Sequence, residues 1–173
     1  MEAPVCVRSA TLADSGIINR IVERSIRIGC ALDHRNHPLL VSDWLSRSSA
    51  DFISSRLADP HFCLCVALLD DIPVGVGMAR VGGEILLCYV QPESFRRGVG
   101  RALMHNLEGW LRIRGVQHVH LNSTRTAEAF YRHLGYQQAA PPGHSIGLQT
   151  VPLRKPLSSP AGQLDQGCKS APR

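Results

Sequence analysis

The sequence predicts an α+β fold of the α/β/α type, in which helices flank a mixed, mostly antiparallel central sheet with one parallel βαβ crossover. Three strand-like runs follow one another between residues 61 and 90, and tight turns separate them. A helical stripe and a further strand then occupy residues 101–121, an order typical of a crossover between parallel strands. One short strand and several helices precede the three strand-like runs, and two short strands close the predicted domain.

The N-terminal part is predicted to form one strand and a helix. Residues 5–8 are a short strand, and Thr11 with Asp14 is a start of the capping-box kind. Apolar residues then recur at helical spacing as far as Ile26, so we expect a helix that frays near Gly29.

The next segment is predicted to hold two more helices and the first two strands of the antiparallel run. A polar break covers residues 33–38, and Pro38 suits the first turn of the helix that follows. A further helical piece covers residues 51–57. The strands are expected at residues 61–69 and 74–81.

The C-terminal part is predicted to complete the crossover and the closing hairpin. Its elements are a strand at 84–90, a helix at 101–113, a strand at 116–121, a helix at 126–134 and strands at 136–139 and 148–153. The chain after residue 155 shows no apolar period, so we expect residues 156–173 to be a disordered tail.

Composition and charge exclude several classes of protein. No apolar run is long enough to span a membrane, and the N-terminus lacks the apolar core of a signal peptide, so we expect a cytoplasmic protein without a membrane partner. The net charge of +5 comes from scattered arginines without a dense basic run, so a phosphate-rich cofactor explains it as well as nucleic acid, which we do not expect. The cysteines lack a second half at ligand spacing, and no metal is expected.

The segment with the clearest chemical meaning is residues 95–101, Phe-Arg-Arg-Gly-Val-Gly-Arg, between a predicted strand and a predicted helix. Glycines let the backbone approach a ligand, and a helix N-terminus adds free N–H donors and partial positive charge, so the segment predicts a pyrophosphate cradle. A P-loop is excluded because no Lys-Ser/Thr follows the glycines, and a dinucleotide fingerprint lacks its third glycine.

Two motifs together resemble the GNAT superfamily of N-acetyltransferases. Residues 95–100 are similar to its Arg/Gln-x-x-Gly-x-Gly/Ala signature, with Phe95 at the first position. Residues 127–136, Ala-Glu-Ala-Phe-Tyr-Arg-His-Leu-Gly-Tyr, are similar to its second signature, and Thr124 stands where that motif usually has Asn. The resemblance covers about residues 3–155, so residues 1–155 are expected to be a GNAT acetyltransferase domain.

The resemblance implies transfer of an acetyl group from acetyl-CoA to an amine, without a metal. The enzyme is then an acyltransferase that transfers groups other than aminoacyl groups. The residues that the resemblance assigns to acetyl-CoA are Cys88, Tyr89, Val90, Arg96, Arg97, Gly98, Val99, Gly100, Arg101, Ala102, Asn122, Thr124 and Tyr131. The N–H of Val90 is the candidate donor to the thioester oxygen, where negative charge develops.

Two residues are candidates for the proton transfers of this reaction. Tyr131 matches the family's tyrosine proposed as general acid, because a phenol can protonate the leaving thiolate. Glu84 matches the spacing of the base glutamate in the histone-acetyltransferase branch, and it would deprotonate the amine directly or through water. For each, an ordinary structural role is the competing interpretation.

The acceptor is the least constrained part of the prediction. In the family the first two helices wall the acceptor site, so Arg27, Asp33 and His34 are candidates for acceptor contact. We expect a primary amine of a small molecule to attack directly, and the alternatives are a protein lysine or N-terminal acetyltransferase and a non-catalytic CoA-binding module. GNAT proteins often form dimers, so the resemblance also implies a homodimer.

Overall fold

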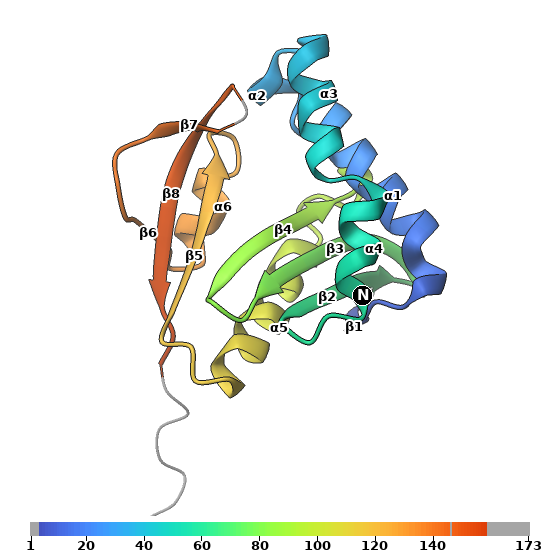
Figure 1. Ribbon diagram of the computed structural model, residues 1–173, viewed down its shortest axis with the longest axis vertical. Coiled ribbons are helices and arrows are strands. Elements are labelled where there is room, and N and C mark those ends of the chain that lie inside the picture. The colour runs from blue at the N-terminus through green and yellow to red at the C-terminus, as the bar shows by residue number, and fades with distance from the viewer. Residues whose placement is uncertain (1–3, 146, 159–173) are drawn as a thin grey trace, which may run out of the picture.

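The computed structural model describes residues 4–145 and 147–158. Within them one eight-stranded sheet is flanked by helices (Figure 1). The strands are β1 (Val5–Ser9), β2 (Phe62–Leu69), β3 (Ile72–Arg80), β4 (Glu84–Val90), β5 (His118–Thr124), β6 (Gln137–Gln138), β7 (Gly143–Ser145) and β8 (Leu148–Pro156). The helices are η1 (Leu12–Asp14), α1 (Ser15–Arg24), η2 (Ser25–Gly29), α2 (Ala31–His34), α3 (Pro38–Arg47), α4 (Ala50–Leu57), η3 (Pro92–Ser94), α5 (Val99–Ile113) and α6 (Glu128–His133).

The sheet has the predicted mixed topology. Its strand order is β1-β2-β3-β4-β5-β8-β6, and β7 pairs with β8. Every neighbouring pair is antiparallel except β4 and β5, which α5 joins as a parallel crossover. The α/β/α fold with one parallel βαβ unit is therefore confirmed.

The parallel pair β4–β5 is joined at one end only. Among the described residues, the register of these strands contains the single pair Glu84 and His120, next to a hydrogen bond of 2.9 Å from the N–H of His120 to the carbonyl of Gly83. Beyond this point the backbones of the two strands diverge toward the C-terminal end of β4 (Figure 1), and the region between the diverging backbones is called the gap below. The register of β4 also shifts against β3 between Met78 and Ala79, as at a β-bulge.

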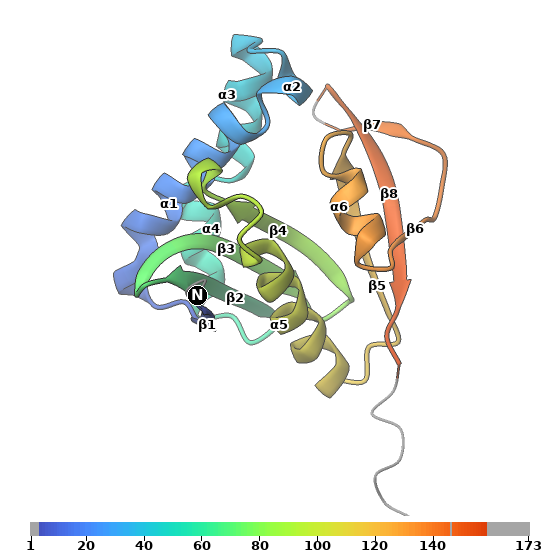
Figure 2. The same ribbon diagram turned by 180° about the vertical axis from the view of Figure 1, so that it is seen from behind.

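Two apolar clusters hold the layers together. On one face, α1, η2, α3 and α4 cover β2, β3 and β4 through side chains that include Ile18, Ile26 and Trp44. On the other face, α5 lies across the sheet and buries Leu103, Leu107 and the rest of its apolar stripe (Figure 2). None of the helices in the described residues is long and apolar enough to cross a membrane.

The predicted elements differ from the observed ones mainly where helices end. The expected fraying near Gly29 is an ordered π-helical turn, η2, and the short helix α2 follows it and ends inside the expected polar break. Strand β5 lies a few residues later than expected, and β7 was missed. Strand β8 continues to Pro156 and Leu157 is buried, so ordered structure passes the expected boundary at residue 155, while residues 159–173 of the predicted tail lie outside the described residues.

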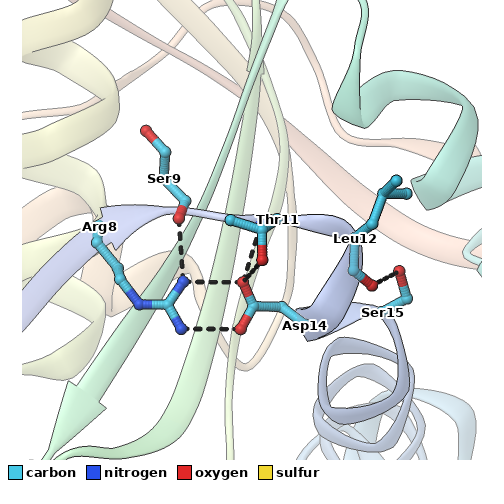
Figure 3. A network of polar contacts seen from close by, with 6 residues as sticks. All are labelled: Arg8, Ser9, Thr11, Leu12, Asp14 and Ser15. Atoms are coloured by element: carbon cyan, nitrogen blue, oxygen red, sulfur yellow. Dashed lines mark hydrogen bonds and ion pairs between the residues drawn. The ribbon is translucent and has the colours of Figure 1, made fainter.

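The predicted capping box ties the first helix to the first strand (Figure 3). Both carboxylate oxygens of Asp14 accept hydrogen bonds from the guanidinium group of Arg8, each at 2.8 Å. Asp14 Oδ2 also accepts from the N–H of Thr11 at 2.8 Å and from its hydroxyl at 3.0 Å. Asp14 is nearly buried, and these donors, above all Arg8, hold the pKa of its carboxyl group well below its usual range.

We expect Asp14→Asn to destabilise the protein by about 1–2 kcal/mol near pH 7, and the difference to shrink in acid. A carboxyl group whose pKa is lowered by folding stabilises the folded state above its unfolded pKa, near 4, and loses this contribution as the pH falls through its folded pKa. Urea unfolding of both proteins between pH 7 and pH 3 measures this. Asp51→Asn, at an exposed carboxylate in the first turn of α4, is the control, and a difference that stays constant down to pH 3 contradicts the prediction.

Candidate active site between strands β4 and β5

The loop before α5 is shaped to bind an anion. Arg96 (φ 61°) and Gly98 (φ 80°) both adopt the left-handed conformation on either side of Arg97, a backbone arrangement that turns N–H groups inward. Within the described residues, the N–H groups of residues 96–101 donate no hydrogen bond to another backbone group. In the same part of the chain, no carboxylate pairs with the exposed side chains of Arg96, Arg97 and Arg101. Free donors, a helix N-terminus and three cations are the features that the sequence analysis expects of a pyrophosphate cradle.

Gly98 and Gly100 each suit their position in this loop for a different structural reason. A Cβ atom on Gly98 would meet no heavy atom within 4 Å, but the backbone there is left-handed. A Cβ atom on Gly100 would lie 3.0 Å from Cζ of Phe130, so this glycine lets α5 contact the ring that α6 carries. Val99 is buried under the helix start, and the N–H of Ala102 makes the first helical hydrogen bond, 3.0 Å to the carbonyl of Gly98.

The edge of β4 that faces the gap offers backbone donors. The N–H of Gln91 donates to the carbonyl of Val74 in β3 at 2.8 Å, so the backbone groups of Val90 point the other way. The carbonyl of Val90 accepts a hydrogen bond of 2.8 Å from the hydroxyl of Ser25 in η2. The N–H of Val90 shares this direction, which places it at the gap, where the sequence predicts a donor to the thioester.

Tyr131 lies between the two diverging strands. It is 9% exposed, and its hydroxyl group lies beside the thiol of Cys88 on β4. Burial, followed by the neighbouring Cys88 and Tyr89, raises the pKa of Tyr131 well above its usual value, and burial raises the pKa of Cys88 to about 12. At neutral pH Tyr131 therefore keeps its phenolic proton, and Cys88 is an uncharged thiol.

Tyr89 packs on the other face of β4 from Cys88, toward the helices α1, α3 and α4. Its hydroxyl accepts a hydrogen bond of 2.8 Å from Nε1 of Trp44 in α3. Ser25 and Trp44 therefore bind the two candidate residues Val90 and Tyr89, and neither contact was predicted from the sequence. The signal for Ser25 was available, because it is a polar residue on the buried face of a helix that otherwise carries isoleucine and valine.

Glu84 lies at the closed end of the gap. It begins β4, forms an ion pair with Arg80 and stands next to His120 of β5. Strand β4 rises about 3.3 Å per residue, so Glu84 is about 13 Å along the strand from Cys88. A carboxylate at this distance can reach an amine near Cys88 only through water.

The β5 side of the gap carries Asn122 and Thr124. Asn122 is exposed on the face of β5 opposite α6, and Ser123 is buried toward that helix. The hydroxyl of Thr124 accepts a hydrogen bond of 3.3 Å from the N–H of Ala127. Thr124 therefore caps the start of α6, and its side chain supports the helix that carries Tyr131.

The predicted acceptor residues belong to η2 and α2 and face different partners. Arg27 forms an exposed ion pair of 2.9 Å with Glu23. His34 is 1% exposed; its Nδ1 accepts from the N–H of Asn36 at 3.0 Å, and its Nε2 donates to the carbonyl of Ile26 at 2.8 Å. The π-helical turn leaves that carbonyl free, so both ring nitrogens of His34 are engaged in holding η2.

Asp33 bridges the mouth of the gap. Its carboxylate accepts hydrogen bonds from the hydroxyl of Thr126 and, at 3.2 Å, from the N–H of the same residue, which lies 93 positions later in the chain. Leu40 in α3 lies against Gly147, where a Cβ atom would come within 2.6 Å of the leucine side chain. The first helices thus contact the β5–α6 loop and the β7–β8 hairpin across the open end.

Phe95 makes a packing contact in place of the expected polar one. Its ring lies over Gly29, where a Cβ atom would be 3.1 Å from Cζ of the ring. An ion pair between Arg24, the last residue of α1, and Glu93 of η3 also links the segment before the anion loop to the first helices. The anion loop is therefore fastened to η2 by Phe95, and its exposed arginines are left for a ligand.

A cavity of about 380 Å³ lies between η2, α2 and α3. It is lined by Arg27, His34, Asn36, Pro38, Val41, Ser42 and Leu45. No cluster of three or more potential metal ligands occurs among the residues that the structure describes.

Similar proteins agree on one family. The acetyltransferase (GNAT) domain family matches residues 32–157. N-alpha-acetyltransferase 80 of Mus musculus is 35% identical over 117 residues, which are 59% of this chain and 37% of the mouse protein. The uncharacterized protein YyaT of Bacillus subtilis is 30% identical over 90 residues, which are 50% of this chain and 60% of that protein. The chain therefore matches less than two thirds of either relative.

Solved structures show the same fold. A GCN5-related N-acetyltransferase from Rhodopseudomonas palustris superimposes with a TM-score of 0.80 at 22% identity, covering 91% of this chain and 98% of the other. The PaiA N-acetyltransferase of Thermoplasma acidophilum, solved in complex with coenzyme A, has a TM-score of 0.76 at 14% identity, covering 89% and 99% of the two chains. With its fold, its two motifs and a domain match over most of its length, the chain belongs to the GNAT acetyltransferases, a family of acyl-transferring enzymes.

Proposed function

We propose that this protein transfers the acetyl group of acetyl-CoA to a primary amine of a small acceptor by direct attack. The observation that carries the proposal is the alignment of three groups along β4 and its loop: the free N–H groups of residues 96–101, the N–H of Val90 at the gap and the phenol of Tyr131. The complex of the Thermoplasma relative with coenzyme A supports the choice of donor.

Each group has a separate task in this reaction. The loop around Gly98 binds the pyrophosphate, and the N–H of Val90 donates to the thioester oxygen as negative charge develops there. Tyr131 gives its proton to the departing thiolate. Glu84 accepts the proton of the attacking amine through water.

The bridged mouth of the gap favours a small acceptor. Asp33 with Thr126, and Leu40 with Gly147, close the end at which an extended peptide would leave the site. A protein N-terminus is the second candidate, because one relative is an N-alpha-acetyltransferase and another similar structure is a ribosomal-protein-S18-alanine N-acetyltransferase from Escherichia coli. A small amine fits inside the contacts of Asp33 with Thr126 and of Leu40 with Gly147, whereas a protein N-terminus requires the rest of its chain to pass between them.

Release of free thiol from acetyl-CoA, measured with polyamines, amino acids, aminoglycosides and peptides, tests the proposal. Mass spectrometry of the products identifies the acetylated group. Turnover with a small amine supports the proposal, and turnover with peptides alone favours the second candidate. Tight CoA binding without an acetylated product from any acceptor would mean that the protein is a CoA-binding module.

Glu84→Gln tests the water-mediated base. We expect kcat to fall by about a hundredfold at neutral pH and the acid limb of its pH profile to disappear, because an amide cannot accept the proton. Asp43→Asn breaks a comparable ion pair with Arg47 on α3 and serves as control. Near-full kcat of Glu84→Gln at every pH would remove Glu84 from the mechanism.

A further inference from the structure

A buried polar cluster lies on the α5 side of the sheet and contains none of the residues to which a task was assigned above. Glu108 of α5 is 6% exposed. Its carboxylate accepts hydrogen bonds from Nζ of Lys155 at 2.8 and 3.1 Å and from the hydroxyl of Tyr136 at 2.8 Å. Lys155 belongs to β8 and Tyr136 follows α6, so one carboxylate joins three segments that are distant in sequence.

This cluster contacts Tyr131 through Tyr136. The two aromatic rings meet edge to face, with centroids 5.8 Å apart and planes at 70°. The N–H of Tyr136 also donates to the carbonyl of Tyr131 at 3.1 Å. Tyr136 is 2% exposed, and Nζ of Lys155 lies 5.5 Å from the centroid of its ring. The ring of Tyr136 thus contacts Tyr131 and Lys155, and its hydroxyl binds Glu108.

The backbone alone leaves the position of Tyr131 weakly determined. Within the described residues, β4 and β5 share one register pair, at the end of the gap opposite the anion loop. Tyr131 comes from the β5–β8 half of the sheet, whereas the N–H of Val90 comes from the other half. Helix α5 begins at the anion loop and packs on the half of the sheet that contains β4 and Val90. A contact from α5 to β8 therefore fixes this half against the half that contains β5 and β8.

We infer that Glu108 and Lys155 position the general acid, acting through the ring of Tyr136 to hold the hydroxyl of Tyr131 at the gap. The inference rests on the proposed function, in which Tyr131 protonates the leaving thiolate. Burying a carboxylate and an ammonium group is not in itself stabilising, since a pair of apolar side chains often does as well. A positional role explains why charged groups are used here.

A double-mutant cycle separates positioning from stability. Glu108→Gln retains an acceptor for the hydroxyl of Tyr136 and removes the charge that binds Lys155. We expect it to lower kcat about tenfold without changing the affinity for CoA, and to have almost no effect on kcat when Tyr131 is already Phe. Lys155→Met keeps an unbranched chain against Tyr136 and is measured in the same two backgrounds, in case Glu108→Gln folds poorly.

The control is Glu128→Gln, which breaks an ion pair with Arg132 on α6, the helix that carries Tyr131. It is expected to leave kcat unchanged in both backgrounds. Equal losses of kcat for Glu108→Gln and Lys155→Met with and without Tyr131 would assign the cluster to the fold alone and overturn the inference, while the proposed acetyl transfer would stand. Full kcat of Tyr131→Phe by itself would remove both the acid and the residues said to position it, and absence of any turnover by the unmodified protein would remove the proposed function itself.

Discussion

Tyr131→Phe is expected to lower kcat by about two to three orders of magnitude and to leave the affinity for CoA nearly unchanged. The phenol is buried between β4 and the β5 side of the sheet, and its neighbours there, Cys88 and Tyr89, are also uncharged at neutral pH. In the proposed mechanism this phenol gives its proton to the departing thiolate. The ring itself is retained in Phe, so its edge-to-face contacts with Phe130 and Tyr136 remain.

The pH dependence adds a second test of the same residue. Burial and the adjacent ionisable groups raise the pKa of Tyr131, so the phenol keeps its proton well above pH 9. The kcat of the unmodified protein should therefore not fall between pH 8 and pH 9 through loss of this proton. The measurements are kcat from pH 6 to pH 9.5 and CoA binding by calorimetry. A Phe variant with full kcat across this range would contradict the assignment.

The elements that the sequence predicts best are those whose signal is local. Strand β4 is bounded by a glycine pair and a proline, and α5 carries an uninterrupted apolar stripe, so both appear close to their expected positions. The turn η2 was missed because nothing in a local apolar pattern distinguishes a π-helical turn from the end of an α-helix. Its stability comes from His34 and Phe95, which are contacts made after the chain has folded.

In the candidate site, too, contiguous motifs could be predicted and contacts between distant segments could not. The anion loop is a contiguous motif, and its glycines could be read directly from the chain. The bridge from Asp33 to Thr126 spans 93 residues, and the contact of Glu108 with Lys155 spans 47. Neither contact has a local signature. The gap itself depends on where pairing between β4 and β5 stops, and pairing is a property of two strands that no single segment encodes.

Gly98→Asp is expected to weaken CoA binding by about a hundredfold or more. A side chain at Gly98 meets open space, so the substitution does not disturb the packing of α5. The added carboxylate would lie among the N–H groups that the loop directs at a pyrophosphate. Two like charges about 4 Å apart repel by about 1–4 kcal/mol. Gly100 is a poorer position for the test, because any side chain there meets Phe130 and alters the contact of α5 with α6.

Two matched variants separate the charge from its side effects. Gly98→Asn has nearly the same shape and tolerates the left-handed backbone (φ 80°), so it should cost several-fold in affinity at most. Gly109→Asp adds the same charge to α5 at a site where a Cβ atom also meets nothing within 4 Å, far from the loop, and should leave CoA affinity unchanged. Calorimetric titration of CoA into the three folded variants gives the comparison. Equal affinities for Gly98→Asp and Gly98→Asn would show that no anion is bound at this loop, because the only difference between the two side chains is the charge.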